Sequence, residues 1–408
     1  MGYTKAAITG FSWQTALKIA TAGLSLLKVA TLARLLSPSQ FGQFSLVTIA
    51  LGLSEAVTET GINVTIIQSK RSVEYFLNTA WVVAICRGLL IGSLMVLLGI
   101  VMSGYYDDAS LSPLIALAAM VPIVKGFINP AIVSLHKDLR FFADSTYRLS
   151  LVIVDLILAI LLTFWFPTVV SLIVALVGTA LFEVSISLFF FKTRPRFAVI
   201  PSRVKEILHN SKGLSIAAAL QYINENVDNL LVGKLLGTFN LGLYHNGYRL
   251  AHKPNTDAAT AASHGVFPVY TKIAQDNKRL VRAFSRSTTA VFILATIATL
   301  PLILAPEFFV QIVLGNQWLA ITPAVPWLAG AGLVHTFTTL SYTLLLTKKD
   351  YRLLNTHQLG TAIATIISLA VLAQSWNLLG AGIAIFFARL SMLPILGYAL
   401  YKHLFREQ

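Results

Sequence analysis

The feature that most constrains this chain is a series of predominantly apolar runs, each about 20 residues long. Clear examples cover residues 79–102, 111–133, 149–165, 169–191 and 287–305. A helix of about 20 apolar residues crosses a hydrocarbon core of roughly 30 Å, so each run is long enough to span a membrane. Only 12% of the residues are charged, about half the share of a soluble protein. The sequence therefore predicts an all-α integral membrane protein.

Hydropathy predicts about twelve transmembrane helices distributed over the whole chain. We place them at residues 10–34, 41–68, 78–102, 111–134, 146–165, 168–191, 213–236, 240–269, 286–305, 324–346, 357–375 and 378–402. The one cysteine, Cys86, falls inside an apolar run and is expected to be a small buried residue, so no disulfide or thiol metal site is predicted.

The basic residues are concentrated on one side of this arrangement. If the N-terminus is cytoplasmic, the basic segments 70–71, 137–148, 192–212, 272–286 and 348–352 are cytoplasmic too, whereas the acidic turn with Asp107 and Asp108 is external. Cytoplasmic loops of membrane proteins carry an excess of Lys and Arg. This asymmetry indicates a multi-pass inner-membrane protein with both termini in the cytoplasm. It also accounts for the net charge of +14, so we expect no nucleic-acid partner.

The longest connection, residues 192–212, divides the chain into two halves. It is basic, and Pro195 and Pro201 interrupt any continuous helix there. We expect a first six-helix bundle at 1–191, a cytoplasmic linker at 192–212 and a second six-helix bundle at 213–408.

Two landmarks recur in the same order in both halves. Leu35-Leu36 followed by Phe41-Gly42-Gln43-Phe44 matches Leu235-Leu236 followed by Leu241-Gly242-Leu243-Tyr244, and Lys137-Asp-Leu-Arg140 matches Lys349-Asp-Tyr-Arg352. Each half has an even number of predicted spans, so the two copies have the same orientation in the membrane. The pattern predicts a parallel internal repeat of the kind found in transporters.

These residues resemble the polysaccharide-exporter branch of the multidrug/oligosaccharidyl-lipid/polysaccharide exporter superfamily. The segment Arg34–Val47 and its copy Leu236–Leu250 carry the resemblance, together with Phe267-Pro268 and Lys137-Asp-Leu-Arg-Phe141. The resemblance implies a MATE-like fold in which two six-helix bundles face a central cavity. It also implies a flippase that moves oligosaccharide linked to a polyprenyl pyrophosphate across the bacterial inner membrane by alternating access.

In that family the product supplies surface polysaccharide such as O-antigen or exopolysaccharide, in lipopolysaccharide or related biosynthesis. The expected partners are the lipid-linked oligosaccharide, membrane lipids and the polysaccharide polymerase machinery. Two alternatives stay open: a cation-coupled multidrug exporter of the same superfamily, and a membrane polymerase, which would need a longer external loop than this chain has.

Polar residues within the first two spans of each half are the candidate site. An ionisable group at membrane depth costs a few kcal/mol on insertion scales, so it invites a functional explanation. Residues three or four positions apart share a helix face, and on that basis we expect these side chains to line the cavity: Lys18, Glu55, Glu59, Asn63, Gln221, Glu225, Asp228, Arg249, His252 and Lys253. Basic groups in a low-dielectric cavity would neutralise the pyrophosphate.

The same residues have a structural explanation, as interhelical pairs that set packing. Among the isolated charges we expect Arg87 to pair with Asp155 or Glu183, and Lys28 to extend toward a membrane interface. His335 is expected to be a hydrogen-bonded structural residue. Two proline-containing segments, around Pro254 and from Pro122 to Pro130, predict bends.

Motifs for other chemistry are missing from the sequence. It contains no G-x-x-x-x-G-K-[ST] and no H-E-x-x-H, which argues against ATP hydrolysis and zinc hydrolase chemistry. We expect a protein that is not an enzyme, with no catalytic residues, no metal and no cofactor.

Overall fold

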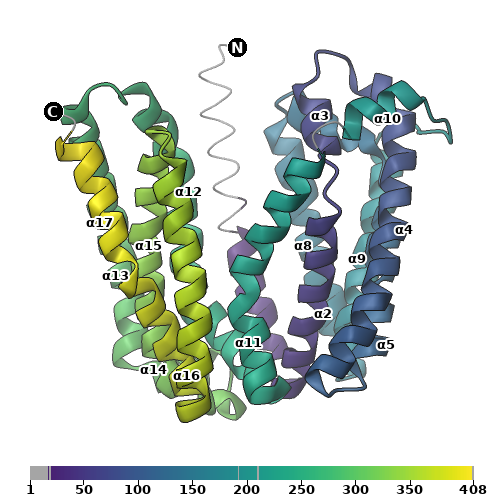
Figure 1. Cartoon of the computed structure of the whole chain (residues 1–408). Helices are drawn as coiled ribbons and strands as arrows, with labels where there is room; N and C mark the ends of the chain where they lie inside the picture. The colour runs from purple at the N-terminus through teal and green to yellow at the C-terminus, as the bar shows by residue number, and fades with distance from the viewer. Residues whose placement is uncertain (1–16, 18–19, 192, 209–210, 407–408) are drawn as a thin grey trace. The chain divides into compact units, whose positions relative to one another are not determined.

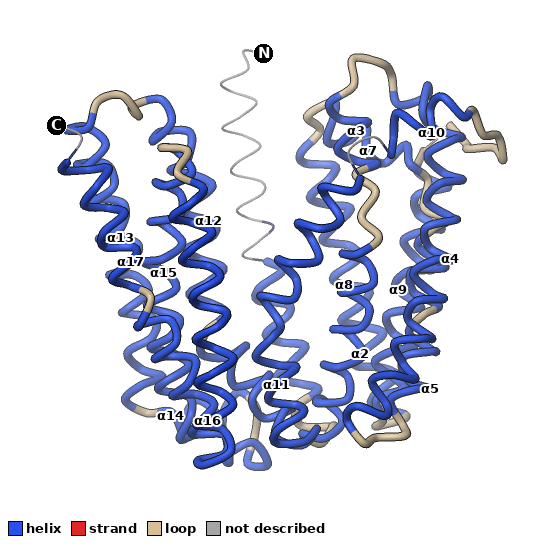
Figure 2. The backbone as a smooth tube through the Cα atoms, in the orientation of Figure 1, coloured by secondary structure: helices blue, strands red, loops and turns tan. Residues whose placement is uncertain are grey.

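The computed structural model describes residues 17, 20–191, 193–208 and 211–406, and these residues fold into helices and connecting loops (Figures 1 and 2). They form two compact units. The first unit runs to Leu36 and resumes from Gln43 to Asn226, and the second comprises Ser37–Gly42 and the chain from Val227 onward. The unit boundaries cut through two helices, α2 and α11, instead of coinciding with the linker. The bundle limits predicted from the sequence stay a proposal.

The first unit contains most of α2, the start of α11 and all the helices between them. Their bounds are α2 Pro38–Val57, α3 Ile62–Gln68, α4 Val73–Tyr106, α5 Leu111–Ala118, α6 Met120–Lys125, the 3₁₀ helix η1 Pro130–Ile132, α7 Val133–Lys137, α8 Phe141–Trp165, α9 Val169–Phe190 and α10 Pro201–Leu208.

The second unit contains the rest of α11 and the helices that follow it. Their bounds are α11 Ser211–Ala251, α12 Lys253–Lys272, α13 Asn277–Leu304, α14 Pro306–Val313, the 3₁₀ helix η2 Asn316–Ala324, α15 Val325–Thr347, α16 Tyr351–Ser391, α17 Leu393–Tyr401 and the π-helical turn η3 Lys402–Arg406.

Six helical stretches in the described residues are long and apolar enough to cross a membrane, and a bent pair makes a seventh. The stretches at 316–347 and 351–404 combine consecutive helices. In α16 the backbone is non-helical at Trp376 and Asn377, between the predicted spans 357–375 and 378–402. The helices α2, α11 and α12 do not pass the same test, as expected for helices that carry polar stripes. Only part of the first predicted span is described, as the helix Ala20–Leu32.

Four of the predicted spans are interrupted. One of them, 378–402, breaks at Met392 between α16 and α17. The span 41–68 breaks after α2, where Gly61 has a φ of 66°, and the span 111–134 bends by 70° between Lys125 and Pro130. The span 240–269 is interrupted at His252, two residues before Pro254. Proline lacks the N–H that would continue the helix. The bend predicted for the segment from Pro122 to Pro130 is present, whereas the backbone at His252, before Pro254, stays right-handed helical.

Apolar side chains are exposed along the outer helices, as the membrane requires. In the most apolar stretch of each helix, only 17% of the residues of α8 and 11% of those of α13 are buried. Phe164 and Ile297 are among the exposed side chains. Cys86 of α4 is also exposed, so the expectation that it is buried was wrong. Lipid tails solvate such residues, so exposed apolar side chains cost little in a membrane helix.

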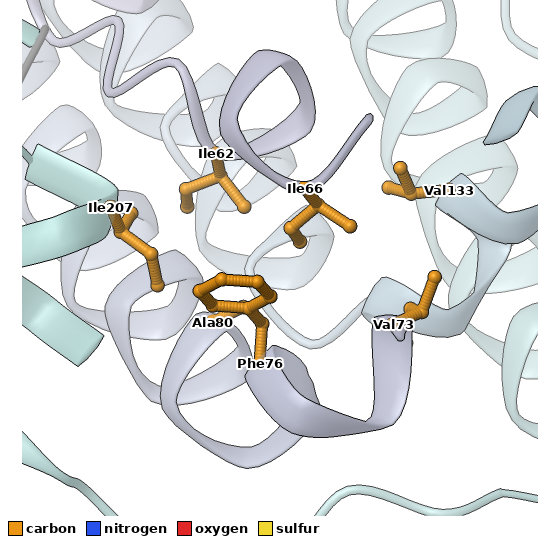
Figure 3. Packing of buried hydrophobic residues seen from close by; sticks show 7 residues of the cluster. All are labelled: Ile62, Ile66, Val73, Phe76, Ala80, Val133 and Ile207. Carbon is orange, nitrogen blue, oxygen red and sulfur yellow. The ribbon is translucent and has the colours of Figure 1, made fainter. Parts of the chain in front are cut away.

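The amphipathic helix α10 of the linker packs on the first unit. Its Ile207 is fully buried in a cluster with Ile66, Phe76 and their neighbours, which Figure 3 shows around the ring of Phe76. On the same helix, the guanidinium of Arg203 lies 3.9 Å from the centroid of the Tyr75 ring, and Arg71 lies 4.2 Å from it. Apolar burial and cation–π contacts therefore hold this basic segment in place.

The first repeat landmark packs against its own copy. Both segments belong to the second unit, where a Cβ atom on Gly42 would clash with the carbonyl oxygen of Thr238 and one on Gly242 would clash with that of Pro38. The hydroxyls of Ser39 and Thr238 lie 3.4 Å apart at the same crossing. Glycine lets two helix backbones approach this closely, so the repeated glycines are explained by a reciprocal helix crossing.

The second landmark is out of register with the backbone. The turn residues with positive φ are Leu139 (56°) and Lys349 (58°), and the helices that follow start at Phe141 and Tyr351. Equivalent turn positions are therefore 210 residues apart, whereas the matched Lys-Asp pairs are 212 apart. The motif match predicted from the sequence is shifted by two residues, although the turn itself recurs.

Lysines close the ends of two helices at these turns. The Nζ of Lys137 donates to the carbonyls of Ile66 and Ser69 at 2.8 and 3.0 Å, and that of Lys348 donates to the carbonyl of Ala274 at 3.0 Å. The last carbonyls of a helix lack partners within the helix, so each lysine ties a helix end to the turn of the repeat.

Asp350 joins the C-terminal residues to the turn before α16. One of its oxygens accepts hydrogen bonds from Lys402 at 2.9 Å and His403 at 2.8 Å, and the other accepts from the backbone N–H of Leu353. Burial opposes ionisation of Asp350, but the bonds from Lys402 and His403 outweigh it and lower the pKa of the carboxyl to about 2. The carboxylate is therefore ionised at neutral pH and can hold both groups.

We expect Gly42→Val and Gly242→Val each to destabilise the protein by about 1–3 kcal/mol, because the added side chain meets backbone and not a flexible neighbour. The melting temperature of the detergent-solubilised protein, followed by size-exclusion chromatography, measures the effect. Gly104→Val is the matched control, since a Cβ there has nothing within 4 Å. Equal melting temperatures for all three variants would contradict the close crossing.

Candidate functional site

The polar face of α2 packs against the start of α11 within the first unit. The hydroxyl of Ser215 donates to the carbonyl of Glu59 at 2.6 Å, and that of Tyr222 donates to the carbonyl of Thr48 at 3.3 Å. The ring of Tyr222 lies directly on Gly52, where any Cβ would overlap it. Part of the predicted stripe is therefore occupied by a tyrosine that the sequence analysis did not single out.

Arg87 of α4 closes the end of α2. Its Nε donates to the carbonyl of Thr58 at 2.8 Å, and its Nη2 donates to the carbonyl of Glu55 at 3.0 Å and to a carboxylate oxygen of Glu59 at 3.2 Å. The second oxygen of Glu59 accepts from the N–H of Gly61 at 2.9 Å. The guanidinium thus binds carbonyls that the break in α2 leaves without helical partners.

The predicted partners of Arg87 are engaged elsewhere. Asp155 accepts from Lys28 at 2.6 Å, which is an ion pair between two half-buried side chains. Glu183 accepts from the hydroxyl of Tyr147 at 3.3 Å. The predicted pairing of Arg87 with Asp155 or Glu183 was therefore wrong. The assignment of Lys28 to a membrane interface was wrong too, because Lys28 forms an ion pair with Asp155. Sequence patterns do not show which helices lie side by side, so they could not identify these pairs.

Three acidic or amide residues predicted on one face of α11 have different surroundings. Gln221 and Glu225 are exposed and form a hydrogen bond of 2.9 Å. Asp228 is buried, and it accepts from the hydroxyl of Tyr244 at 2.7 Å and from the N–H of Asn229 at 2.8 Å. Asn63 was predicted on the same helix as Glu55, but α2 ends at Val57 and Asn63 belongs to the separate helix α3. Its side chain is exposed.

The basic stripe predicted for span eight is divided by the interruption at His252. Arg249 lies before it on α11 and is half-buried. Lys253 follows it on α12 and forms an exposed ion pair of 3.4 Å with Asp257. His252 itself is fully buried, with Nδ1 3.0 Å from the hydroxyl of Thr256. The three side chains are therefore not equivalent members of one exposed stripe.

A further polar group lies inside the second unit, which we call the Arg389 cluster and define as Tyr248, His252, His335 and Arg389. Arg389 of α16 is hydrogen-bonded to Nδ1 of His335 and, at 3.4 Å, to the hydroxyl of Tyr248. The Tyr248 ring stacks on His252 with centroids 4.2 Å apart, and the two histidine rings are 5.6 Å apart. The expected hydrogen bonding of His335 is confirmed.

Arg389 was not assigned to the candidate site from the sequence, because nothing local in the sequence places it beside span eight. Lys18 lies outside the described residues. Among the residues that the structure describes, no three His, Cys, Asp or Glu side chains form a group that could hold a metal ion.

Known proteins of related sequence belong to polysaccharide biosynthesis. The profile of the family described as "Polysaccharide biosynthesis protein" matches residues 31–323. The lipopolysaccharide biosynthesis protein WzxC of Escherichia coli is 24% identical over 336 residues, which are 82% of this chain and 68% of that protein. The teichuronic acid biosynthesis protein TuaB of Bacillus subtilis is 20% identical, covering 92% of this chain and 78% of that protein.

Solved structures with the same fold are transporters. The lipid II flippase MurJ in an inward closed conformation gives a TM-score of 0.76 at 12% identity, over 95% of this chain and 87% of that one. An inward-facing multidrug transporter of the MATE family gives 0.61 at 14% identity, over 96% and 94% of the two chains. The fold is therefore that of the multidrug/oligosaccharidyl-lipid/polysaccharide superfamily of membrane transporters, as predicted.

Within that superfamily the family model covers well over half of the sequence. The chain belongs to the polysaccharide biosynthesis protein family, and the predicted family relationship is confirmed.

We expect Arg87→Gln to lower the melting temperature more than Glu59→Gln, because the first change removes two bonds to backbone carbonyls and the second leaves them in place. Leaving buried polar groups unpaired costs about 1–3 kcal/mol each. Arg282→Gln, at an exposed arginine of α13, controls for the loss of positive charge. A smaller effect for Arg87→Gln than for Glu59→Gln would contradict the capping role.

Proposed function

We propose that this protein is a flippase of the bacterial inner membrane, not an enzyme, and that it moves lipid-linked oligosaccharide units toward the outer face by alternating access. The observation that carries the proposal is the family match over residues 31–323. The transporter fold supports it independently. Related proteins are named for the biosynthesis of lipopolysaccharide and teichuronic acid, and a third is the succinoglycan biosynthesis transport protein ExoT of Rhizobium meliloti, 23% identical over 78% of this chain and 64% of that protein.

The proposed substrate carries its sugars on a polyprenyl pyrophosphate. A pyrophosphate cannot cross a hydrocarbon layer without compensation of its charge, and guanidinium and ammonium groups at low dielectric supply that compensation at close range. Arg249 and Lys253 are the basic residues of the predicted site that we assign to it. Polysaccharide polymerase machinery is the partner we expect to take the product.

The carboxylates divide into two proposed roles. Glu59 has both oxygens engaged at the end of α2, so we assign it to helix packing. Glu225 is exposed and bonded to Gln221, and together with Glu55, Asn63, His252 and Asp228 it stays a proposed cavity residue.

Transport activity is tested in proteoliposomes that contain a fluorescent lipid-linked oligosaccharide. Wild-type protein should make the labelled lipid accessible on both faces, and Arg249→Ala with Lys253→Ala should slow this at least tenfold, because charge and not packing is removed. Asp257→Asn is the matched control, since it breaks the ion pair of Lys253 and leaves the ammonium available. Full activity of the double variant would contradict a substrate role for these cations, and export of a cationic dye by an otherwise inactive protein would favour the multidrug exporter.

The proposed topology has both termini in the cytoplasm. In a Cys86→Ser background, cysteines at Ser202 and Asn277 should react only with a thiol reagent that is admitted to the cytoplasm, whereas a cysteine at Ser110 should react from outside. The reason is that basic segments stay on the cytoplasmic side. Labelling of Ser202→Cys by an impermeant reagent in intact cells would reverse the orientation.

A further inference from the structure

Arg389 differs from other cations of the membrane helices in what it binds. Lys28 pairs with Asp155 and Arg87 with Glu59, so both cations have a carboxylate. The hydrogen-bond partners of Arg389 in the part of the chain that the structure describes are neutral groups, the ring of His335 and the hydroxyl of Tyr248. Arg389 is half-buried in α16. A positive charge held in a membrane helix by neutral partners alone is costly to keep.

The nearby carboxylate Asp228 does not compensate Arg389 by contact. Its two oxygens accept from Tyr244 and from the N–H of Asn229. Tyr244 and Tyr248 lie one turn apart on α11, with ring centroids 6.1 Å apart. One tyrosine therefore binds the anion and the next binds the cation, and the two charges are held apart although an ion pair would stabilise each of them.

The groups around Arg389 are suited to an anion with several oxygens. A guanidinium carries five N–H donors in a planar fork, and at most two of its nitrogens are engaged here. Because Arg389 donates to Nδ1 of His335, the neutral ring of His335 carries its proton on Nε2 and can donate as well. His252 adds a buried Nε2 without a hydrogen-bond partner among the described residues. Bidentate recognition of phosphate oxygens is the typical use of such a fork.

We propose that the Arg389 cluster binds a phosphate group in the second unit. The inference rests on the proposed function for its physiological source, which is the pyrophosphate of the lipid-linked substrate. The same chemistry would accept free inorganic pyrophosphate or phosphate, and the experiment separates these sources.

Binding is measured on the purified full chain in lipid nanodiscs by isothermal titration calorimetry. The probe is geranylgeranyl pyrophosphate, compared with inorganic pyrophosphate and with geranylgeraniol. We expect Arg389→Gln to weaken binding of geranylgeranyl pyrophosphate at least tenfold, Arg389→Lys to weaken it less because the charge remains, and geranylgeraniol to bind equally to all variants. Arg282→Gln removes the same charge at an exposed position and should leave the affinity unchanged.

Tighter binding of the lipid pyrophosphate than of inorganic pyrophosphate identifies the lipid-linked source. The reverse order identifies free pyrophosphate. Wild-type affinity in Arg389→Gln overturns the proposal. If Arg389→Gln does not fold, the affinities of Arg389→Lys and Tyr248→Phe test the proposal instead. Tyr248→Phe removes the hydroxyl that orients the guanidinium. Unchanged affinity in both variants also overturns the proposal.

In the competing role, Arg389 compensates the negative charge of Asp228 at long range and binds no ligand. In that case Asp228→Asn combined with Arg389→Gln would restore both the melting temperature and the affinity to wild-type values, and this outcome also overturns the proposal. A phosphate site predicts that the double variant still binds at least tenfold more weakly than Asp228→Asn alone. If wild-type protein flips no lipid-linked oligosaccharide but its pyrophosphate binding depends on Arg389, the site stands and the proposed function fails.

Discussion

The hydrocarbon core of a membrane contains no water that could form hydrogen bonds with polar groups. The ion pairs and hydrogen bonds inside each unit follow from this constraint. A charge at the centre of a membrane helix costs roughly 2.5–3.5 kcal/mol on insertion scales, and unpaired backbone groups are costly as well. The ion pair of Lys28 with Asp155 and the bonds of Arg87 to the end of α2 reduce these costs within the first unit. The remaining faces of helices such as α8 and α13 expose apolar side chains instead.

The same constraint explains why helix breaks and cations occur together. When α2 ends at Val57 inside its predicted span, carbonyls lose their helical partners, and Arg87 binds two of them. At turns outside the predicted membrane segments, Lys137 and Lys348 also donate to backbone carbonyls, at the ends of α3 and α12. The hydrogen bonds of Arg87, Lys137 and Lys348 assign these basic residues to the architecture, which narrows the set of cations left to bind a ligand.

The internal repeat contributes packing as well as symmetry. The first landmark and its copy meet at Gly42 and Gly242, where each helix fits against the carbonyl of the other. A larger residue at either position would separate the helices. The single crossing of the two helices therefore requires glycine at both positions. No such close contact constrains the Lys-Asp landmark. Its motif is offset by two residues between the halves, whereas the left-handed turn occurs at equivalent positions in both. Backbone geometry is therefore the better guide to equivalence between the halves.

Local patterns in the sequence determined the fold class and the family, because the length of apolar runs and the residues of the helix junctions are read without knowing what packs against them. The periodicity also predicted polar stripes on the first two spans of each half, but Glu59 and Asn63 lie beyond the end of α2 and Lys253 lies on a separate helix from Arg249. Only the tertiary structure decided which charges meet. Arg87 pairs with Glu59 and not with Asp155, and Arg389 lies beside Tyr248 and His335 across 141 and 54 residues of sequence. Electrostatic pairing depends on distances of a few ångströms between side chains on different helices, and neither periodicity nor composition contains those distances.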